Sequence, residues 1–257
     1  MLKQLFEAAA QDAATREREI SIEQLAETAS RVSPPVNAYD SLAKSPHIKL
    51  IAEIKRASPS RGDLAEIPDA AKLAVGYQSA GAHAISVLTE RTGFKGSLAD
   101  LADVSAAVSI PTLRKDFISS EYQILEAKVA GASMILLILA HLDSESFVRL
   151  FKFAHSVGLG VLVETHNEAE IDAAGDIGAQ LIGINTRDLK TFKTDIGLFE
   201  RMATRLPGES IKVAESSVRE LGDVQRYRDA GADVVLVGEA LVTGDYADLI
   251  PRIVSVS

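Results

Sequence analysis

The sequence contains no cysteine and no long apolar run. Without cysteine, the protein has no disulfide framework and no thiolate chemistry. No apolar run approaches the ~18 residues that a membrane-spanning helix needs. The first 19 residues are charged throughout and lack the apolar core of a signal peptide. We therefore expect a cytoplasmic protein that does not associate with membranes.

Positive charge is also scarce relative to negative charge. The formal net charge is −9, so the chain has no electrostatic basis for binding nucleic acid or an anionic membrane. The 257 residues are 47% hydrophobic and 25% charged, which is an ordinary globular balance. This length allows one large α/β domain or two small domains.

Eight short apolar runs, each about as long as a strand, recur along the chain. Most are continuous rather than alternating, which is typical of parallel strands that are covered on both faces. Amphipathic segments with helical spacing separate them. The runs cover residues 49–55, 84–90, 111–117, 134–140, 160–166, 181–187, 211–217 and 234–240.

A Gly-Ala pair precedes every second run, which indicates an internal repeat. The glycines are Gly81, Gly131, Gly178 and Gly231, at intervals of 50, 47 and 53 residues. A unit of two strands and two helices has about this length, and four such units predict a (β/α)8 barrel. A doubly wound open sheet is the alternative, although no G-x-G-x-x-G follows the first run.

About 45 residues precede the first run, and their composition favours helix until Ser33-Pro34-Pro35 interrupts it. We expect residues 1–45 to form an N-terminal helical extension packed on the barrel. The whole chain, 1–257, is then a single barrel domain.

Polar residues cluster at the ends of the runs, where a barrel has its active-site face. Glu53, Lys115, Glu164 and Glu215 end the first, third, fifth and seventh runs. Barrel layers are filled from alternate strands, so these four side chains are predicted to converge. The alternative is a set of structural ion pairs that cap the core. Burying so many charges costs several kcal/mol each, which favours a functional site.

The last two turns predict a phosphate site. Ser216 and Ser217 precede one helix, and Gly238 begins another short helical stretch. Free backbone N–H groups at helix N-termini bind phosphate, and barrels often do so after strands seven and eight. Helix capping by Ser217 is the simpler interpretation.

Together the runs resemble the indole-3-glycerol phosphate synthase family. The matching segments are IAEIKRASPS (51–60), FKGS (94–97), RKDF (114–117), VETH (163–166), GINTRDL (183–189), AES (214–216) and VGEAL (237–241). The resemblance spans all eight runs and the N-terminal extension. It implies a carboxy-lyase of tryptophan biosynthesis that needs no cofactor and no metal. Its substrate is 1-(2-carboxyphenylamino)-1-deoxyribulose 5-phosphate, which undergoes ring closure, decarboxylation and dehydration.

The resemblance also implies residue roles. Lys115 is the general acid for the substrate carbonyl, and Glu164 is the acid/base for dehydration. Lys55 and Arg187 would bind anionic groups, Asn185 would orient intermediates, and Glu53 and Glu215 would complete the polar site. Substrate contacts are expected from Ser58, Phe94, Phe117 and Leu136, and phosphate contacts from Ser216, Ser217, Gly238 and Glu239. The family usually has glycine where this chain has Ser217, which puts phosphate affinity in question.

Two other functions stay open at this point. A neighbouring phosphosugar barrel, phosphoribosylanthranilate isomerase, would share the terminal phosphate turns but not the combination of Glu53, Lys55, Lys115 and Glu164. A barrel without catalysis, serving as a binding subunit, is the second alternative. The five histidines show no paired ligand spacing, so we expect surface or capping roles for them and no metal. A monomer or weak homo-oligomer is expected, with possible association with other enzymes of the tryptophan pathway.

Overall fold

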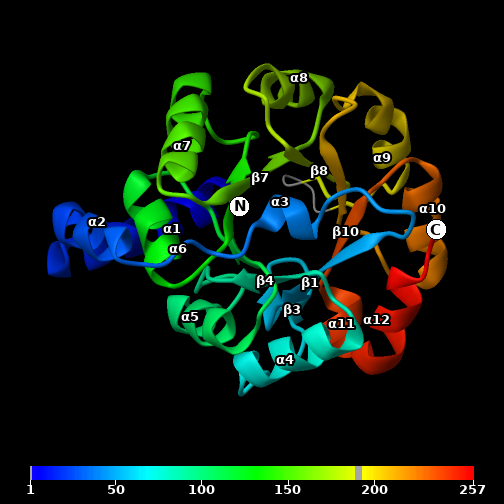
Figure 1. Cartoon of the computed structure of the whole chain (residues 1–257), viewed down its shortest axis with the longest axis horizontal. Coiled ribbons are helices and arrows are strands. Elements are labelled where there is room, and N and C mark those ends of the chain that lie inside the picture. The colour runs from blue at the N-terminus through cyan, green and yellow to red at the C-terminus, as the bar shows by residue number, and fades with distance from the viewer. Residues whose placement is uncertain (1, 189–192) are drawn as a thin grey trace.

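The computed structural model describes residues 2–188 and 193–257. Leu189, the last residue of the GINTRDL segment, lies outside the described residues. In the described part of the chain, eight parallel strands close into a barrel in sequential order, with helices arranged around them (Figure 1). The strands are β1 (Lys49–Ile54), β4 (Ala84–Leu88), β5 (Thr112–Lys115), β6 (Met134–Ile138), β7 (Gly160–Thr165), β8 (Leu181–Asn185), β9 (Ile211–Glu215) and β10 (Val234–Val237).

The predicted barrel is confirmed, and the open-sheet alternative is excluded because β1 pairs with both β4 and β10. Each strand lies within one of the eight predicted runs, but most strands end two or three residues before the run does. The polar residues at the ends of the runs therefore stand on the last two residues of a strand or just after it. A short antiparallel pair, β2 (Ala57–Ser58) and β3 (Gly62–Asp63), lies in the loop after β1.

The helices that follow the strands form the outer layer. They are α4 (Ala70–Ala80), α5 (Leu98–Ala107), α6 (Glu121–Val129), α7 (Ser144–Ser156), α8 (Glu168–Asp176), α9 (Gly197–Met202), α10 (Leu221–Asp229), α11 (Glu239–Thr243) and α12 (Tyr246–Val254), with a 3₁₀ turn at Ala203–Arg205. The glycines of the sequence repeat end helices: Gly81, Gly131, Gly178 and Gly231 all have positive φ, from 73° to 111°. Glycine adopts this left-handed conformation without steric penalty, which explains the repeat.

Successive side chains along each strand point alternately outward and inward, so the barrel has two apolar cores, one between strands and helices and one inside the barrel. Side chains such as Ile135 and Ile182 pack outward against the helices. Leu113, Leu162 and Val213 pack inside the barrel, as the sequence parity predicts. The residues two positions further along, Lys115, Glu164 and Glu215, consequently face the barrel mouth.

The N-terminal segment is helical, as expected, and contains α1 (Leu2–Glu19), α2 (Ile22–Ser30) and α3 (Ala38–Ser41). Helix α2 packs on α6 through Leu25. Helix α3 lies at the N-terminal end of the barrel, where the Tyr39 hydroxyl accepts a hydrogen bond of 3.0 Å from the backbone N–H of Val161 at the start of β7. Leu5 and Phe6 of α1 belong to the inner core and lie at the opposite end, beside Phe117.

Candidate active site

A cavity of about 750 Å³ opens at the C-terminal ends of the strands. Every residue that the sequence singled out for catalysis, substrate contact or phosphate contact lines it. These are Glu53, Lys55, Ser58, Phe94, Lys115, Phe117, Leu136, Glu164, Asn185, Arg187, Glu215, Ser216, Ser217, Gly238 and Glu239. The described residues thus bring the predicted set together in one place, while the role of each stays a prediction.

Lys115 lies at the centre of the polar part of this cavity. Its Nζ is 3.9 Å from Glu53, 3.8 Å from Glu164 and 3.7 Å from Glu215, in each case measured to Oε2. Burial disfavours the charged ammonium, but the three carboxylates outweigh burial and raise the pKa of Lys115. Lys115 is therefore a cation throughout the physiological pH range.

A second cation, Lys55, lies on the other side of Glu53. The Lys55 Nζ is 3.0 Å from Glu53 Oε1, and the Ser86 hydroxyl donates to Glu53 Oε2 at 3.4 Å. Burial opposes ionisation of Glu53, yet Lys55 and Lys115 lower its pKa below the ordinary value. Glu53 is therefore an anion that separates the two ammonium groups.

The pKa values of the neighbouring carboxyl groups of Glu164 and Glu215 shift in opposite directions. Burial and the neighbouring Glu164 carboxylate raise the pKa of Glu215 well above its ordinary value. Burial also opposes ionisation of Glu164, but His166 and Lys115 outweigh it and lower the pKa of Glu164. Two adjacent carboxyl groups that hold different protonation states can act as acid and base in one reaction.

His166 departs from the expected surface or capping role, so that prediction is wrong for this residue. Its ring is 14% exposed and lies between two carboxylates, with Nε2 3.3 Å from Glu164 Oε1 and Nδ1 3.4 Å from Glu170 Oε2. Burial lowers the pKa of His166, but the two carboxylates outweigh burial and raise it to about 10. Strand parity could have found this residue, because His166 follows Glu164 by two positions.

Apolar side chains form a wall in the same cavity. The predicted residues Phe94, Phe117 and Leu136 contribute to it, and Leu2 and Leu5 of α1 complete it. Sequence reasoning did not find the two leucines, because it placed the extension on the barrel without a docking site. Phe94 is held by Glu90, whose carboxylate accepts hydrogen bonds from the backbone N–H groups of Thr92, Gly93 and Phe94.

Two glycines leave room for the buried carboxylates. A Cβ atom at Gly183 of β8 would lie 2.1 Å from Glu215 Oε1, and one at Gly238 would lie 2.5 Å from Glu53 Oε1. Real side chains do not tolerate such distances. Gly183 and Gly238 are therefore required for the observed positions of Glu215 and Glu53.

The turn after β9 has the conformation that glycine would favour. Ser216 and Ser217 have φ angles of 70° and 63°, both in the left-handed region. The Ser217 hydroxyl lies 2.7 Å from that of Thr186, and the Ser216 hydroxyl donates to Asn185 at 2.9 Å. The side chain of Ser217 is therefore engaged within the protein, and the turn keeps the glycine-like backbone despite the substitution.

The other predicted polar residues of the cavity, Arg187 and Glu239, contact the loop that follows β1. Arg187 donates to the Ser60 hydroxyl at 3.2 Å, and Arg61 binds the Glu239 carboxylate at 2.7 Å. Among residues 2–188 and 193–257, no group of three or more His, Cys, Asp or Glu side chains could hold a metal ion. In the same residues, no helix is both long and apolar enough to span a membrane.

Comparisons with known proteins agree on one family. The family model described as indole-3-glycerol phosphate synthase matches residues 2–252. The chain is 51% identical over 245 residues to the indole-3-glycerol phosphate synthase of Leifsonia xyli, covering 95% of this chain and 94% of that protein. It is 51% identical over 243 residues to the enzyme of Mycolicibacterium smegmatis, covering 95% and 89%.

A solved structure supports the fold alone. The 3-hexulose-6-phosphate synthase of Salmonella typhimurium superposes with a TM-score of 0.66 at 16% identity, covering 81% of this chain and 98% of that one. At this identity the likeness extends to the barrel and not to the chemistry.

Proposed function

Because this chain belongs to the indole-3-glycerol phosphate synthase family, we propose that Lys115 and Glu164 carry the reaction of that family in the cavity described above. The reaction converts 1-(2-carboxyphenylamino)-1-deoxyribulose 5-phosphate to indole-3-glycerol phosphate. Membership of this carboxy-lyase family sets aside the isomerase and the non-catalytic barrel as alternatives. The observation that supports the residue roles best is the position of Lys115 among three buried carboxylates, in a cavity that apolar side chains also line.

Ring closure requires a proton donor at the substrate carbonyl. The ring carbon that bears the carboxylate forms a bond to the carbonyl carbon, and the carbonyl oxygen takes a proton. The Lys115 ammonium supplies that proton and stabilises the negative charge that develops on the oxygen. The bond to the carboxylate then breaks, carbon dioxide leaves, and the electron pair restores the aromatic ring.

Dehydration requires an acid for the departing hydroxyl and a base for the hydrogen on the adjacent carbon. We assign this acid/base role to Glu164. Glu215 lies beside Glu164 and completes the polar site. Its raised pKa favours the protonated form, which can supply a proton to Glu164. His166, which the sequence analysis did not select, keeps Glu164 ionised in the resting site.

The other residues bind the two ends of the substrate. Phe94, Phe117 and Leu136 provide an apolar wall for the aromatic ring, and Ser58 lines the same cavity. Lys55 and Arg187 supply positive charge for the anionic groups, and Asn185 orients the intermediates. The phosphate is assigned to the turns at Ser216–Ser217 and Gly238–Glu239, where backbone N–H groups and not the Glu239 carboxylate would bind it.

Single-turnover kinetics on two variants test these assignments. Lys115→Ala should slow ring closure by at least ~10²–10⁴-fold, because nothing then protonates the carbonyl oxygen. Glu164→Gln should impair the later loss of water and let a ring-closed intermediate accumulate. Indole fluorescence follows product without added metal, and circular dichroism verifies that both variants fold. Near-normal turnover by a folded Lys115→Ala would show that Lys115 is only an ion-pair partner.

The proposal extends to the cellular setting. The small phosphorylated substrate fits a cytoplasmic biosynthetic enzyme. We propose that the chain is a monomer or a weak homo-oligomer, with possible association with other enzymes of the tryptophan pathway. Sedimentation at several protein concentrations, alone and with those enzymes, tests both statements.

A further inference from the structure

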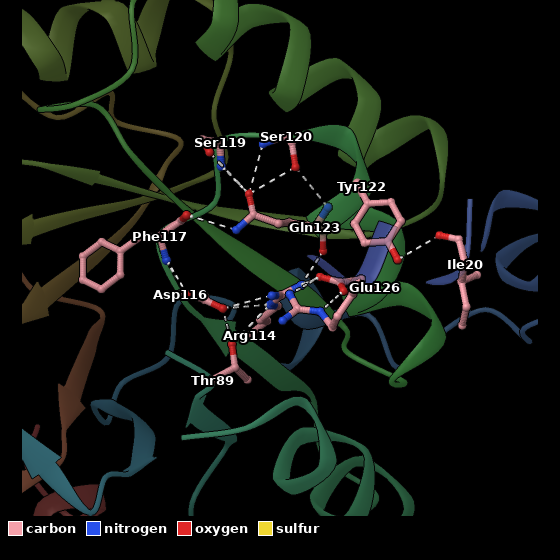
Figure 2. A network of polar contacts seen from close by, with 11 residues as sticks. Ile20, Thr89, Arg114, Asp116, Phe117, Ser119, Ser120, Tyr122, Gln123 and Glu126 are labelled. Carbon is pink, nitrogen blue, oxygen red and sulfur yellow. Dashed lines mark hydrogen bonds and ion pairs between the residues drawn. The ribbon is translucent and has the colours of Figure 1, made fainter. Parts of the chain in front are cut away.

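A buried polar network lies between β5 and α6 (Figure 2). Of its members, Asp116 also lines the active-site cavity, whereas Arg114, Gln123 and Glu126 do not. Its central residue is Arg114, which is 1% exposed and precedes Lys115 on the strand, so the two side chains point to opposite faces. The Arg114 guanidinium donates to Asp116 Oδ2 at 2.9 Å, to the Gln123 carbonyl at 2.6 Å and to Glu126 Oε2 at 3.2 Å. Thr89 accepts from Arg114 Nε at 3.2 Å.

This network holds both backbone polar groups of Phe117. The Phe117 N–H donates to Asp116 Oδ1 at 2.8 Å, and the Phe117 carbonyl accepts from Gln123 Nε2 at 3.2 Å. Figure 2 shows the Phe117 ring pointing away from these contacts, and that ring lines the active-site cavity. The backbone that carries this part of the apolar wall is therefore fixed by two buried side chains, Asp116 and Gln123.

The same network reaches the N-terminal helix α1. Both oxygens of Glu126 accept hydrogen bonds from Arg16, the one to Oε2 at 2.9 Å. The Tyr122 hydroxyl adds a bond of 3.1 Å to the Ile20 carbonyl, just after the end of α1. At its other end, α1 places Phe6 against Phe117, with ring centroids 5.2 Å apart. Helix α1 thus reaches Phe117 through a direct ring contact and through the chain Arg16–Glu126–Arg114–Asp116.

The charges in this chain balance, with two guanidinium groups and two carboxylates. Burying such groups costs several kcal/mol per ion, and apolar residues of similar volume are often at least as stabilising. Stability alone therefore does not account for the network. The charged groups add directional contacts, because the planar guanidinium and its hydrogen-bond acceptors restrict one another's orientation.

We propose that this network positions the aromatic wall of the active site. Asp116 and Gln123 hold Phe117, and Arg16 makes the placement of Phe117 depend on the docking of α1 through Glu126 and Arg114. This inference rests on the proposed contact of Phe117 with the aromatic ring of the substrate. Under this proposal Arg16, Arg114, Gln123 and Glu126, which do not line the active-site cavity, are positioning residues. Asp116 does line it, and its role here is to hold the backbone of Phe117.

The functional consequence is a selective change in substrate binding. Arg16→Gln removes the cation that orients Glu126 and replaces no residue that lines the active-site cavity. If Phe117 contacts the substrate equally in the ground state and the transition state, the variant raises KM by about fivefold to tenfold and changes kcat by less than about twofold. Arg18→Gln is the matched control, because Arg18 lies on the same helix and is exposed. We expect wild-type kinetics from it.

A double-mutant cycle with Phe117→Leu separates positioning from general stabilisation. If Arg16 acts through Phe117, adding Arg16→Gln to Phe117→Leu changes KM by less than about twofold. Arg16→Lys should restore part of the affinity, since lysine keeps the charge but not the two-nitrogen contact. It also serves as the test variant if Arg16→Gln does not fold.

The outcomes distinguish this inference from the proposed site. Full additivity of Arg16→Gln and Phe117→Leu in KM overturns the positioning role and leaves the substrate contact of Phe117 intact. A lower melting temperature with unchanged KM overturns it as well, because the network is then only structural. If Phe117→Leu alone has wild-type KM, the proposed substrate contact fails instead, and this inference fails with it.

Discussion

Replacing His166 by asparagine removes a cation that lies between Glu164 and Glu170 and keeps a polar side chain. The imidazole nitrogens lie 3.3 and 3.4 Å from these carboxylates, and the carboxylates raise the pKa of His166 from 6.5 to about 10 despite burial. A folded-state pKa above the unfolded value stabilises the protein fully below the unfolded pKa, about 6.5. This stabilisation is lost as the pH rises through about 10.

The magnitude follows from two independent arguments. A shift from 6.5 to about 10 corresponds to roughly 5 kcal/mol of interaction between His166 and its surroundings. Removing one partner of a buried ion pair costs about 3–5 kcal/mol, because the other charge is left uncompensated. We therefore expect His166→Asn to lower the free energy of unfolding by about 3–5 kcal/mol near pH 6. The loss should shrink by at least half at about pH 10.5, where His166 is neutral in the wild type.

Urea unfolding at both pH values measures this difference, and groups that titrate alike in both proteins cancel. His47→Asn serves as the control, because His47 is exposed and should show no pH-dependent loss. In the same His166 variant, the pKa of Glu164 should rise once its cation is gone. The acid limb of the kcat profile should then move to higher pH. A stability difference that stays constant between about pH 6 and 10.5 would refute the reasoning, because the pKa of His166 would then not be raised by folding.

Two further substitutions test the glycine positions of the site. Ser217→Gly should lower KM and leave kcat nearly unchanged, because glycine adopts a φ of 63° without strain and the phosphate is bound equally throughout the reaction. Steady-state kinetics decide this, and a kcat change at constant KM would mean a different role for Ser217. Gly183→Ala should reduce kcat at least about tenfold, since the new Cβ displaces the Glu215 carboxylate. Gly208→Ala, where nothing lies within 4 Å of the added atom, should be silent in the same assay.

Local periodicity was sufficient to predict the barrel and the convergence of the strand-end charges at its mouth, whereas the substrate contacts were predicted only from the family resemblance. Lys115 and Glu164 are two residues beyond inward-facing leucines, so strand parity alone places them at the barrel mouth. The position of α1 was not predictable in this way. Leu2 and Leu5 form part of an amphipathic face. An amphipathic pattern indicates that a helix packs on another part of the protein, but it does not identify that part. Only the tertiary structure shows that α1 lies beside the cavity.

Residues 114–116, at the end of β5, show how the alternation of side chains along a strand places charges on both faces of the barrel wall. Lys115 faces the cavity among three carboxylates, while Arg114 and Asp116 pair with each other on the outer face at 2.9 Å. A shift of one residue in strand register would exchange these faces and place Arg114 in the active site. The outward-facing pair opposes such a shift, because the buried guanidinium of Arg114 needs the hydrogen-bond acceptors that Gln123 and Glu126 of α6 provide on the outer face. The buried charges outside the barrel therefore help to specify which charges stand inside it.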